Sequence, residues 1–156
     1  VNLTKEIEQR GVDSSRLILG ESIPKAEYLA RYRVADLFLD THPYNAGTTA
    51  SDALKMGLPM LTMKGKSYQA RMGASIVNAV NLPELITHSQ EEYESLAIEL
   101  ATNPDKLKAI KEKLASNLAT APLYDTKLFA KNIESAYTQM YERHHQGLEP
   151  DHIYVE

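Results

Sequence analysis

Hydrophobic positions occur along this chain in two distinct patterns. The first pattern is a set of short, nearly continuous apolar runs, each too short to form a helix. Such runs are typical of strands that are covered on both faces, as in the parallel sheets of α/β proteins. We predict four strands from them, at residues 17–19, 37–39, 59–63 and 85–87.

The segments between these runs have the second pattern, a period of about 3.6 residues that is typical of amphipathic helices. The clearest case follows Ser89, where Tyr93, Leu96 and Leu100 recur on one face. Ser89 and Glu92 also have the spacing of a capping box, which marks the helix start. We predict helices at residues 3–10, 25–32, 49–56, 68–80, 90–102, 104–118 and 126–145.

Strands that alternate with helices of this length predict βαβ units, and right-handed crossovers place helices on both faces of a parallel sheet. We therefore predict an α/β fold with a Rossmann-like parallel sheet and a helix-rich C-terminus. One domain is expected over residues 1–147, followed by a polar tail at 148–156. The pattern starts on a helix, so we expect this domain to be truncated at its N-terminal end, with one strand upstream of Val1.

Composition narrows the function classes. With 156 residues, of which 43% are apolar and 24% charged, the chain can bury one ordinary core. No apolar run reaches the length of a membrane span, and the N-terminus lacks the features of a signal peptide, so we expect a cytoplasmic protein with no membrane partner. A net charge of -4 disfavours a general nucleic-acid binder, and the absence of cysteine excludes thiolate chemistry.

The segment 40–52 is the strongest candidate for a ligand site. It follows the run at 37–39 and leads into a helix, and ligands of open α/β sheets bind at the carboxyl ends of the strands. Gly47, Thr48 and Thr49 would present backbone amides and two hydroxyls to a phosphate or diphosphate, and Asp52 could accept from a ribose hydroxyl. The alternative is that Thr49 and Asp52 form an ordinary capping box after a turn at Gly47.

A second loop of the same kind precedes Lys25. A cation at a helix start is unfavourable for the helix dipole, which indicates a bound anion or a nucleotide; a solvated surface lysine is the alternative. If 17–19 is a strand, this loop and segment 40–52 face one crevice. His42 could donate to a phosphate or act as an acid or base there, and it could equally be a turn histidine.

Two further classes of site are not supported. Gly65-Lys66-Ser67 is no P-loop, because Met60 stands where that motif needs a glycine. Lys64, Lys66 and Arg71 give this region local positive charge, for which surface solvation is the simpler explanation. The five histidines lack the spacing of a zinc site, so we expect no metal.

Several motifs together resemble the C-terminal catalytic half of O-linked N-acetylglucosamine transferases, in the wording of a bacterial member. The most specific stretch runs from Asp40 to Pro59 and includes Tyr44-Asn45 and Thr48-Thr49-Ala50-Ser51-Asp52. Further matches occur at residues 16–19, 24–25, 71, 74–75, 85–86, 92–93, 122–123, 126–127 and 150–152. The resemblance therefore covers nearly the whole chain.

The resemblance implies a GT-B glycosyltransferase that moves N-acetylglucosamine from UDP-GlcNAc to serine or threonine hydroxyls of proteins, with inversion and without metal or cofactor. Carried over by position, Lys25 would contact the uridine, Tyr28 would lie over the base, and Asp52 would bind the ribose. Thr48 and Thr49, beside Gly47, would hold the diphosphate, with His42 and Asn45 as further candidates. The protein acceptor and the catalytic residues would be held by parts outside this chain, so the chain alone is expected to be inactive.

Two departures leave alternatives open. The family commonly has histidine at the positions of Tyr28 and Gly47, and each lost charge-assisted hydrogen bond costs about 1.5–3 kcal/mol. The alternatives are a non-catalytic α/β interaction module whose nucleotide site has decayed, and a glycosyltransferase with another donor sugar. Because a truncated sheet would expose an edge, we also expect the chain to form a homodimer.

Overall fold

The computed structural model describes residues 2–155, and its centre is a parallel sheet. The strands β1 (Phe38–Leu39), β2 (Met60–Met63) and β3 (Ile86–Thr87) lie in the order β1-β2-β3. Phe38 pairs with Met60, and Thr62 pairs with Ile86. Each strand lies inside one of the predicted apolar runs, so the predicted parallel sheet is confirmed for three of its four strands.

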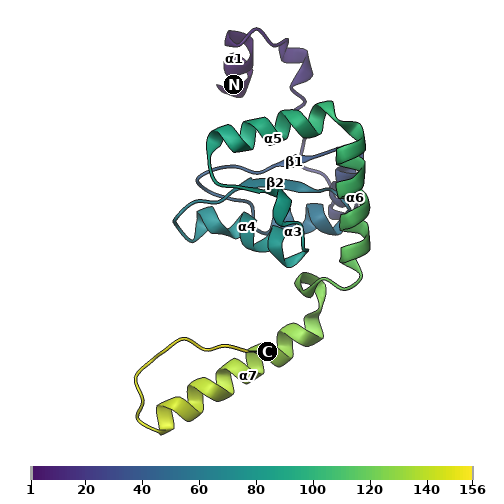
Figure 1. Ribbon diagram of the computed structural model, residues 1–156. Coiled ribbons are helices and arrows are strands. Elements are labelled where there is room, and N and C mark those ends of the chain that lie inside the picture. The colour runs from purple at the N-terminus through teal and green to yellow at the C-terminus, as the bar shows by residue number, and fades with distance from the viewer. Residues whose placement is uncertain (1, 156) are drawn as a thin grey trace.

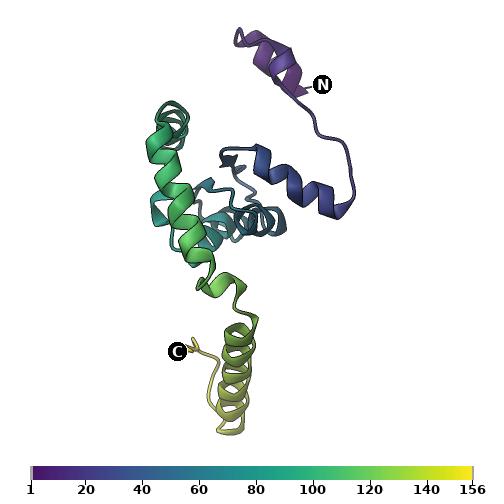
Figure 2. The same ribbon diagram turned by 90° about the vertical axis from the view of Figure 1, so that its right-hand side faces the viewer.

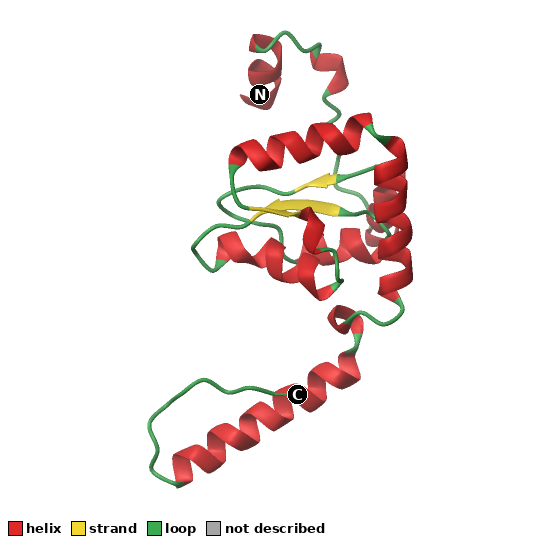
Figure 3. Cartoon of the chain, viewed as in Figure 1, coloured by secondary structure: helices red, strands yellow, loops and turns green. Residues whose placement is uncertain are grey.

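The helices lie where the periodicity predicts them, within a residue or two. They are α1 (Asn2–Gln9), α2 (Lys25–Arg31), α3 (Thr48–Lys55), α4 (Gln69–Ala79), α5 (Gln90–Thr102), α6 (Pro104–Leu118) and α7 (Thr126–His145). Figures 1 and 3 show α5 over one face of the sheet and α3 and α4 over the other. The prediction of helices on both faces is therefore confirmed.

The core forms around the central strand β2. Met60, Leu61 and Thr62 have no exposed surface, which explains why β2 has no alternation of apolar and polar residues. Leu54 of α3 and Val77 of α4 are also completely buried. Burying such a side chain stabilises the fold by about 1.5–3 kcal/mol, so the region around β2 contributes most of the hydrophobic stabilisation.

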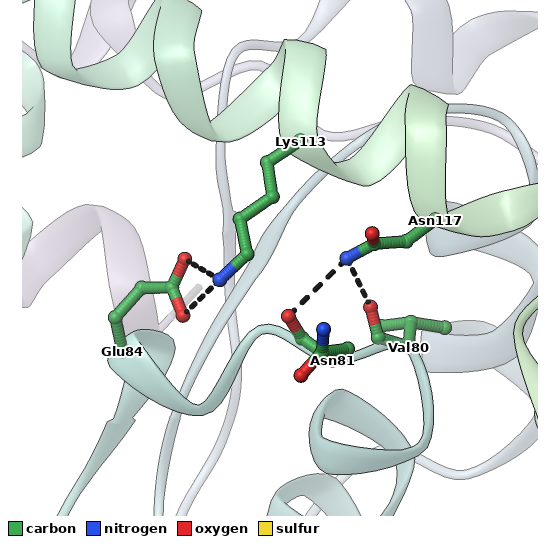
Figure 4. A network of polar contacts seen from close by, with 5 residues as sticks. All are labelled: Val80, Asn81, Glu84, Lys113 and Asn117. Carbon is green, nitrogen blue, oxygen red and sulfur yellow. Dashed lines mark hydrogen bonds and ion pairs between the residues drawn. The ribbon is translucent and has the colours of Figure 1, made fainter.

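Helix α6 is held to this core by polar contacts as well as by its apolar face (Figure 4). Lys113 Nζ donates to both carboxylate oxygens of Glu84, at 2.8 and 2.9 Å. The Asn117 amide donates to the carbonyls of Val80 and Asn81 at 2.9 and 3.2 Å. These carbonyls follow α4 and lack helical partners, so Asn117 satisfies groups that the end of α4 leaves free.

The prediction of a strand at residues 17–19 is wrong. Leu17, Ile18 and Leu19 have no regular secondary structure, and Ile18 is 88% exposed. A strand is stabilised by hydrogen bonds to a neighbour, and no strand of the described chain pairs with this segment. An apolar run is thus insufficient to form a strand where no neighbouring strand pairs with it.

The segments at the two ends of the chain lie outside the core. Figures 1 and 2 show α1 and α7 on opposite sides of the sheet region. Helices α1, α2 and α7 contain no buried residue, and the apolar stripe of α7 stays in solvent, with Phe129 66% and Tyr141 66% exposed. The division into a domain at 1–147 and a tail stays a prediction. Within residues 2–155, no helix is long and apolar enough to cross a membrane.

Strand β1 forms an open edge of the sheet. Beside it lies an apolar cavity of about 740 Å³, lined by Ile18, Val34, Leu39 and Leu58 among others. The backbone N–H groups of Phe38 and Asp40 donate to the carbonyls of Pro59 and Leu61, so the N–H group of the intervening Leu39 faces the open side. The homodimer predicted above concerns this edge, and it stays a prediction.

Candidate functional site

The loop between β1 and α3 is held by the buried side chain of Asp40, which is 6% exposed. Its Oδ1 accepts from the backbone N–H groups of Thr41 and Ala46 at 2.9 and 2.8 Å, and its Oδ2 accepts from the Thr62 hydroxyl at 2.6 Å. Because Asp40 directly follows β1 and Thr62 belongs to β2, this carboxylate fixes the loop to two strands at once.

Asn45, a candidate ligand residue, is buried within the same loop and is 3% exposed. Its side-chain amide donates to the Thr41 carbonyl at 2.8 Å, and its Oδ1 accepts from the Gly73 N–H at 3.3 Å. Both ends of the Asn45 amide are therefore occupied by the protein. Asn45 positions the loop that precedes α3 rather than pointing to solvent.

Gly73 of α4 allows this close packing. A Cβ atom at Gly73 would overlap Asp40 Oδ2 and Thr62 Oγ1, so α4 can approach the loop only with glycine at this position. Gly73 was not predicted as a site residue, and Asp40, although it begins the predicted segment 40–52, was given no role of its own. An aspartate at the end of an apolar run, just before a turn, is the feature that could have indicated Asp40.

Helix α3 begins without a side-chain cap. Gly47 is its N-cap residue and makes no side-chain hydrogen bond there. Thr48 and Thr49 are the first two residues of the helix and are exposed. Among the hydrogen bonds of residues 2–155, none involves the hydroxyls of these threonines or the carboxylate of Asp52. The alternative of a capping box between Thr49 and Asp52 is therefore not formed.

Two tyrosines connect α2 to this helix start. The hydroxyls of Tyr28 and Tyr32 are hydrogen-bonded to each other, and the Tyr32 hydroxyl donates to the Thr49 carbonyl at 3.4 Å. Their rings meet edge to face at a centroid distance of 5.2 Å. Burial, together with the neighbouring Tyr28 and the charge of Asp52, raises the pKa of Tyr32. The structure thus brings the position of Tyr28 close to the first turn of α3.

Lys25 is the first residue of α2 and is exposed. It lies one turn before Tyr28, and no ion pair joins it to a carboxylate of the described residues. The loop before it does not follow a strand, contrary to the prediction, because residues 17–19 are irregular. Lys25 therefore lies at the exposed start of a helix rather than at the end of a strand.

His42 lies at the outer side of the loop and is exposed. It precedes Pro43 in a cis peptide bond, and its ring lies against Gly65 in the loop after β2, where a Cβ atom would come within 2.9 Å of Cε1. His42 is thus placed between the loop before α3 and the loop before α4. Its position is compatible with a contact to a bound ligand and with a turn histidine.

Two more tyrosines bond to the backbone of the loop before α3 and of α3 itself. Tyr93 of α5 donates to the Asp40 carbonyl at 2.9 Å, and Tyr124 donates to the Ser51 carbonyl at 2.7 Å. Burial first, and the charge of Asp40 second, raise the pKa of Tyr93 to about 12. Burial likewise raises the pKa of Tyr124. Both hydroxyls are therefore protonated donors at neutral pH.

A parallel sheet with helices on both faces, and with an uncapped helix start at the carboxyl end of β1, defines a protein of the α/β class, in which ligands bind at the carboxyl ends of the strands. The comparison with known families narrows this class. The profile of glycosyl transferase family 41 matches residues 1–133. The chain therefore belongs to glycosyltransferase family 41.

Relatives and a solved structure agree with this family. The chain is 34% identical over 152 residues to the UDP-N-acetylglucosamine--peptide N-acetylglucosaminyltransferase of Caenorhabditis elegans, covering 97% of this chain and 13% of that protein. It is 36% identical over 147 residues to the probable enzyme of the same name, SEC, of Arabidopsis thaliana, covering 94% and 15%. A mutant of the Thermobaculum terrenum O-GlcNAc transferase superposes with a TM-score of 0.84 at 34% identity, over 90% of this chain and 27% of that one.

The fraction of each relative that this chain covers is small. The chain spans about one seventh of the length of the curated relatives it matches. Its fold matches the C-terminal part of the GT-B fold of the bacterial enzyme, as the resemblance implied. The chain is thus a partial domain of a glycosyltransferase, and the candidate residues above lie in that part.

Proposed function

We propose that this chain is the donor-binding portion of an inverting glycosyltransferase that moves N-acetylglucosamine from UDP-GlcNAc to serine or threonine residues of proteins. The observation that carries the proposal is the start of α3, where Thr48 and Thr49 offer unused hydroxyls beside uncapped amides. A helix N-terminus favours negative charge, and a leaving diphosphate is such a charge. The relatives named for this activity support the donor.

In this proposal each candidate residue has one role. Thr48 and Thr49 bind the diphosphate as charge develops on it, Asp52 accepts from the ribose, and Tyr28 and Lys25 contact the uridine. The helix start takes the role that a metal has in other transferases, so no metal or other cofactor is required. The acceptor protein and the catalytic base belong to parts outside this chain, and a cytoplasmic location completes the proposal.

The test is a titration of the ¹⁵N-labelled chain with UDP, followed by NMR. We expect the amide signals of residues 47–52 to shift, and we expect Thr49→Ala and Asp52→Ala to weaken binding by about tenfold each. Thr126→Ala and Asp105→Ala are matched controls, because they remove the same side chains from the first turns of α7 and α6. A folded chain that shows no shifts at millimolar UDP would contradict the proposal.

Two observations favour keeping two further candidates. Gly47 offers no side-chain donor to the diphosphate, and Tyr28 differs from the histidine common in the family. A transferase with another donor sugar, or an interaction module with a decayed site, would also have these residues. Turnover of a panel of UDP-sugars by the full-length protein would identify the donor sugar. Binding of UDP by the chain would distinguish a transferase, whichever donor sugar it uses, from an interaction module with a decayed site.

A further inference from the structure

A second hollow lies at the carboxyl ends of β2 and β3, away from the start of α3. It is a cavity of about 550 Å³ that is lined by side chains of three elements and contains three basic groups. The polar members of its lining are Lys64, Arg71, Ser75, Asn78 and His88. None of them belongs to the candidate donor set.

The chain brings these groups together for clear local reasons. Lys64 directly follows β2, and its N–H bonds to the Thr87 carbonyl at 2.9 Å, which places Lys64 beside the end of β3 and next to His88. Arg71, Ser75 and Asn78 have the spacing i, i+4 and i+7 and therefore share one face of α4. The carboxyl ends of two strands and one helix face thus meet at this cavity.

Helix α4 separates this cavity from the candidate donor site. Gly73 and Val77 are buried, and Gly73 lies against Asp40 and Thr62. Arg71, Ser75 and Asn78 lie on the exposed side of the same helix. A ligand in the cavity would therefore contact α4 from the opposite face.

The charges in the cavity have no internal partner. Lys106, Lys108, Lys111 and Lys113 each form an ion pair, whereas Lys64 and Arg71 form none within residues 2–155. Among the described residues, Arg71 Nη1 donates only to the Lys66 carbonyl, at 3.2 Å. One carboxylate lies nearby, since Glu92 Oε2 accepts from the His88 N–H at 2.8 Å. Two permanent cations thus remain available, flanked by a hydroxyl and an amide.

We propose that this cavity binds a phosphate group, at a site separate from the nucleotide. Two permanent cations match the charge of a phosphate monoester, which is about -1.5 to -2 at neutral pH, better than the single charge of a carboxylate. Arginine binds phosphate through paired N–H groups, while lysine adds a point charge. The hydroxyl of Ser75 and the amide of Asn78 supply neutral donors to the remaining oxygens.

The experiment is an NMR titration of the labelled chain with inorganic phosphate, with O-phosphoserine and with glutamate. We expect both phosphates to shift the amide signals around Lys64, Arg71 and His88, and glutamate to bind more weakly. Lys64→Gln and Arg71→Gln should each weaken phosphate binding by about threefold, because the groups are partly solvated. Lys127→Gln on α7 makes the same charge change away from the cavity and should have no effect.

The titrations with the two phosphates distinguish a phosphorylated organic ligand from the free phosphate ion. Tighter binding of O-phosphoserine than of inorganic phosphate would assign the cavity to a phosphorylated organic molecule, and equal binding would assign it to the free ion. Shifts confined to residues 47–52, glutamate binding as tight as phosphate, or binding unchanged in both Gln variants would overturn the proposal. UDP binding at α3 is scored on different residues, so the two proposals succeed or fail separately.

Discussion

Helices α3 and α5 both begin at the carboxyl edge of this sheet, and their first turns differ. At α5, the Ser89 hydroxyl accepts from the Glu92 N–H at 3.2 Å, and Glu92 Oε2 accepts from the His88 N–H at 2.8 Å. At α3, Gly47 provides no side-chain cap, and the hydroxyls of Thr48 and Thr49 are unused within the described chain. One helix start is satisfied by the protein, and the other leaves its donors to solvent or a ligand.

The difference shows how a binding site is distinguished from an ordinary helix start. A capping box stabilises the fold and leaves little free for a ligand, whereas an uncapped start gives up that stabilisation and keeps its partial positive charge available. The cost is compensated by the surroundings of α3. Asp40 is bonded to Thr62 of β2, Asn45 to Gly73 of α4, and Tyr32 to the first turn of α3. The following predictions test this comparison, from the largest expected effect to the smallest.

Gly73→Ala should have the largest effect, because it breaks the support of the α3 loop. The added Cβ would overlap Asp40 and Thr62, and we expect a loss of about 3 kcal/mol in the free energy of unfolding. Gly47→Ala is the matched control, since a Cβ there meets only Met72, at 4.0 Å. Urea unfolding measures both, and a Gly73→Ala chain as stable as the control would show that this close approach is not required.

Gly47→His should increase the difference between the starts of α3 and α5, because it adds a side-chain hydrogen-bond donor at the start of α3. The position has space for a side chain and a negative φ of -108°, so the substitution should fold. We expect UDP to bind about tenfold tighter, as one charge-assisted hydrogen bond permits. Titration calorimetry measures this effect, and unchanged or weaker binding would remove the diphosphate from this helix start.

Ser89→Ala and Thr49→Ala should differ in what they change. Ser89→Ala removes a formed cap and should destabilise the chain by about 1 kcal/mol without an effect on UDP binding. Thr49→Ala removes an unused hydroxyl and should change the free energy of unfolding by less than about 0.5 kcal/mol. Thermal unfolding measures both substitutions. An equal loss in the free energy of unfolding would show that the first turns of α3 and α5 are capped to the same extent.

The smallest effect concerns alkaline pH and the bond from α5 to the α3 loop. The pKa of Tyr93 is raised from 10.0 to about 12 in the folded chain, so its contribution to stability is complete below pH 10 and is lost as the pH rises towards 12. Tyr93→Phe should cost about 0.5–1 kcal/mol at pH 7 and should reduce the decline in stability above pH 10. Tyr137→Phe, at an exposed position on α7, is the control and should leave the pH profile unchanged.

Local patterns predicted most of the fold. Each helix has its own period, and Ser89 begins α5 as its capping box indicates. Gly11 and Gly147 follow α1 and α7 with positive φ values of 74° and 68°, the left-handed conformation in which a glycine commonly ends a helix. These features depend on neighbours within a few residues, so one sequence is sufficient to find them.

Features that depend on distant neighbours were missed. Ile18 belongs to an apolar run but has no strand to pair with, and the apolar stripe of α7 has nothing to cover it in the described chain. Asp40 acquires its role from Thr62, which is 22 residues away in the sequence, and from the close approach of Gly73. The order of the strands decides these contacts, and periodicity contains no information about strand order.

The tyrosine pair between α2 and α3 also has an optical consequence. The chain has nine tyrosines and no tryptophan, so its ultraviolet emission comes from tyrosine alone. Tyr28 and Tyr32 share a hydrogen bond, and Tyr32 is bonded to the carbonyl of Thr49, in the first turn where a diphosphate would bind. Binding of a diphosphate at that helix start would therefore be expected to change the emission of this pair, which adds to the emission of the other tyrosines.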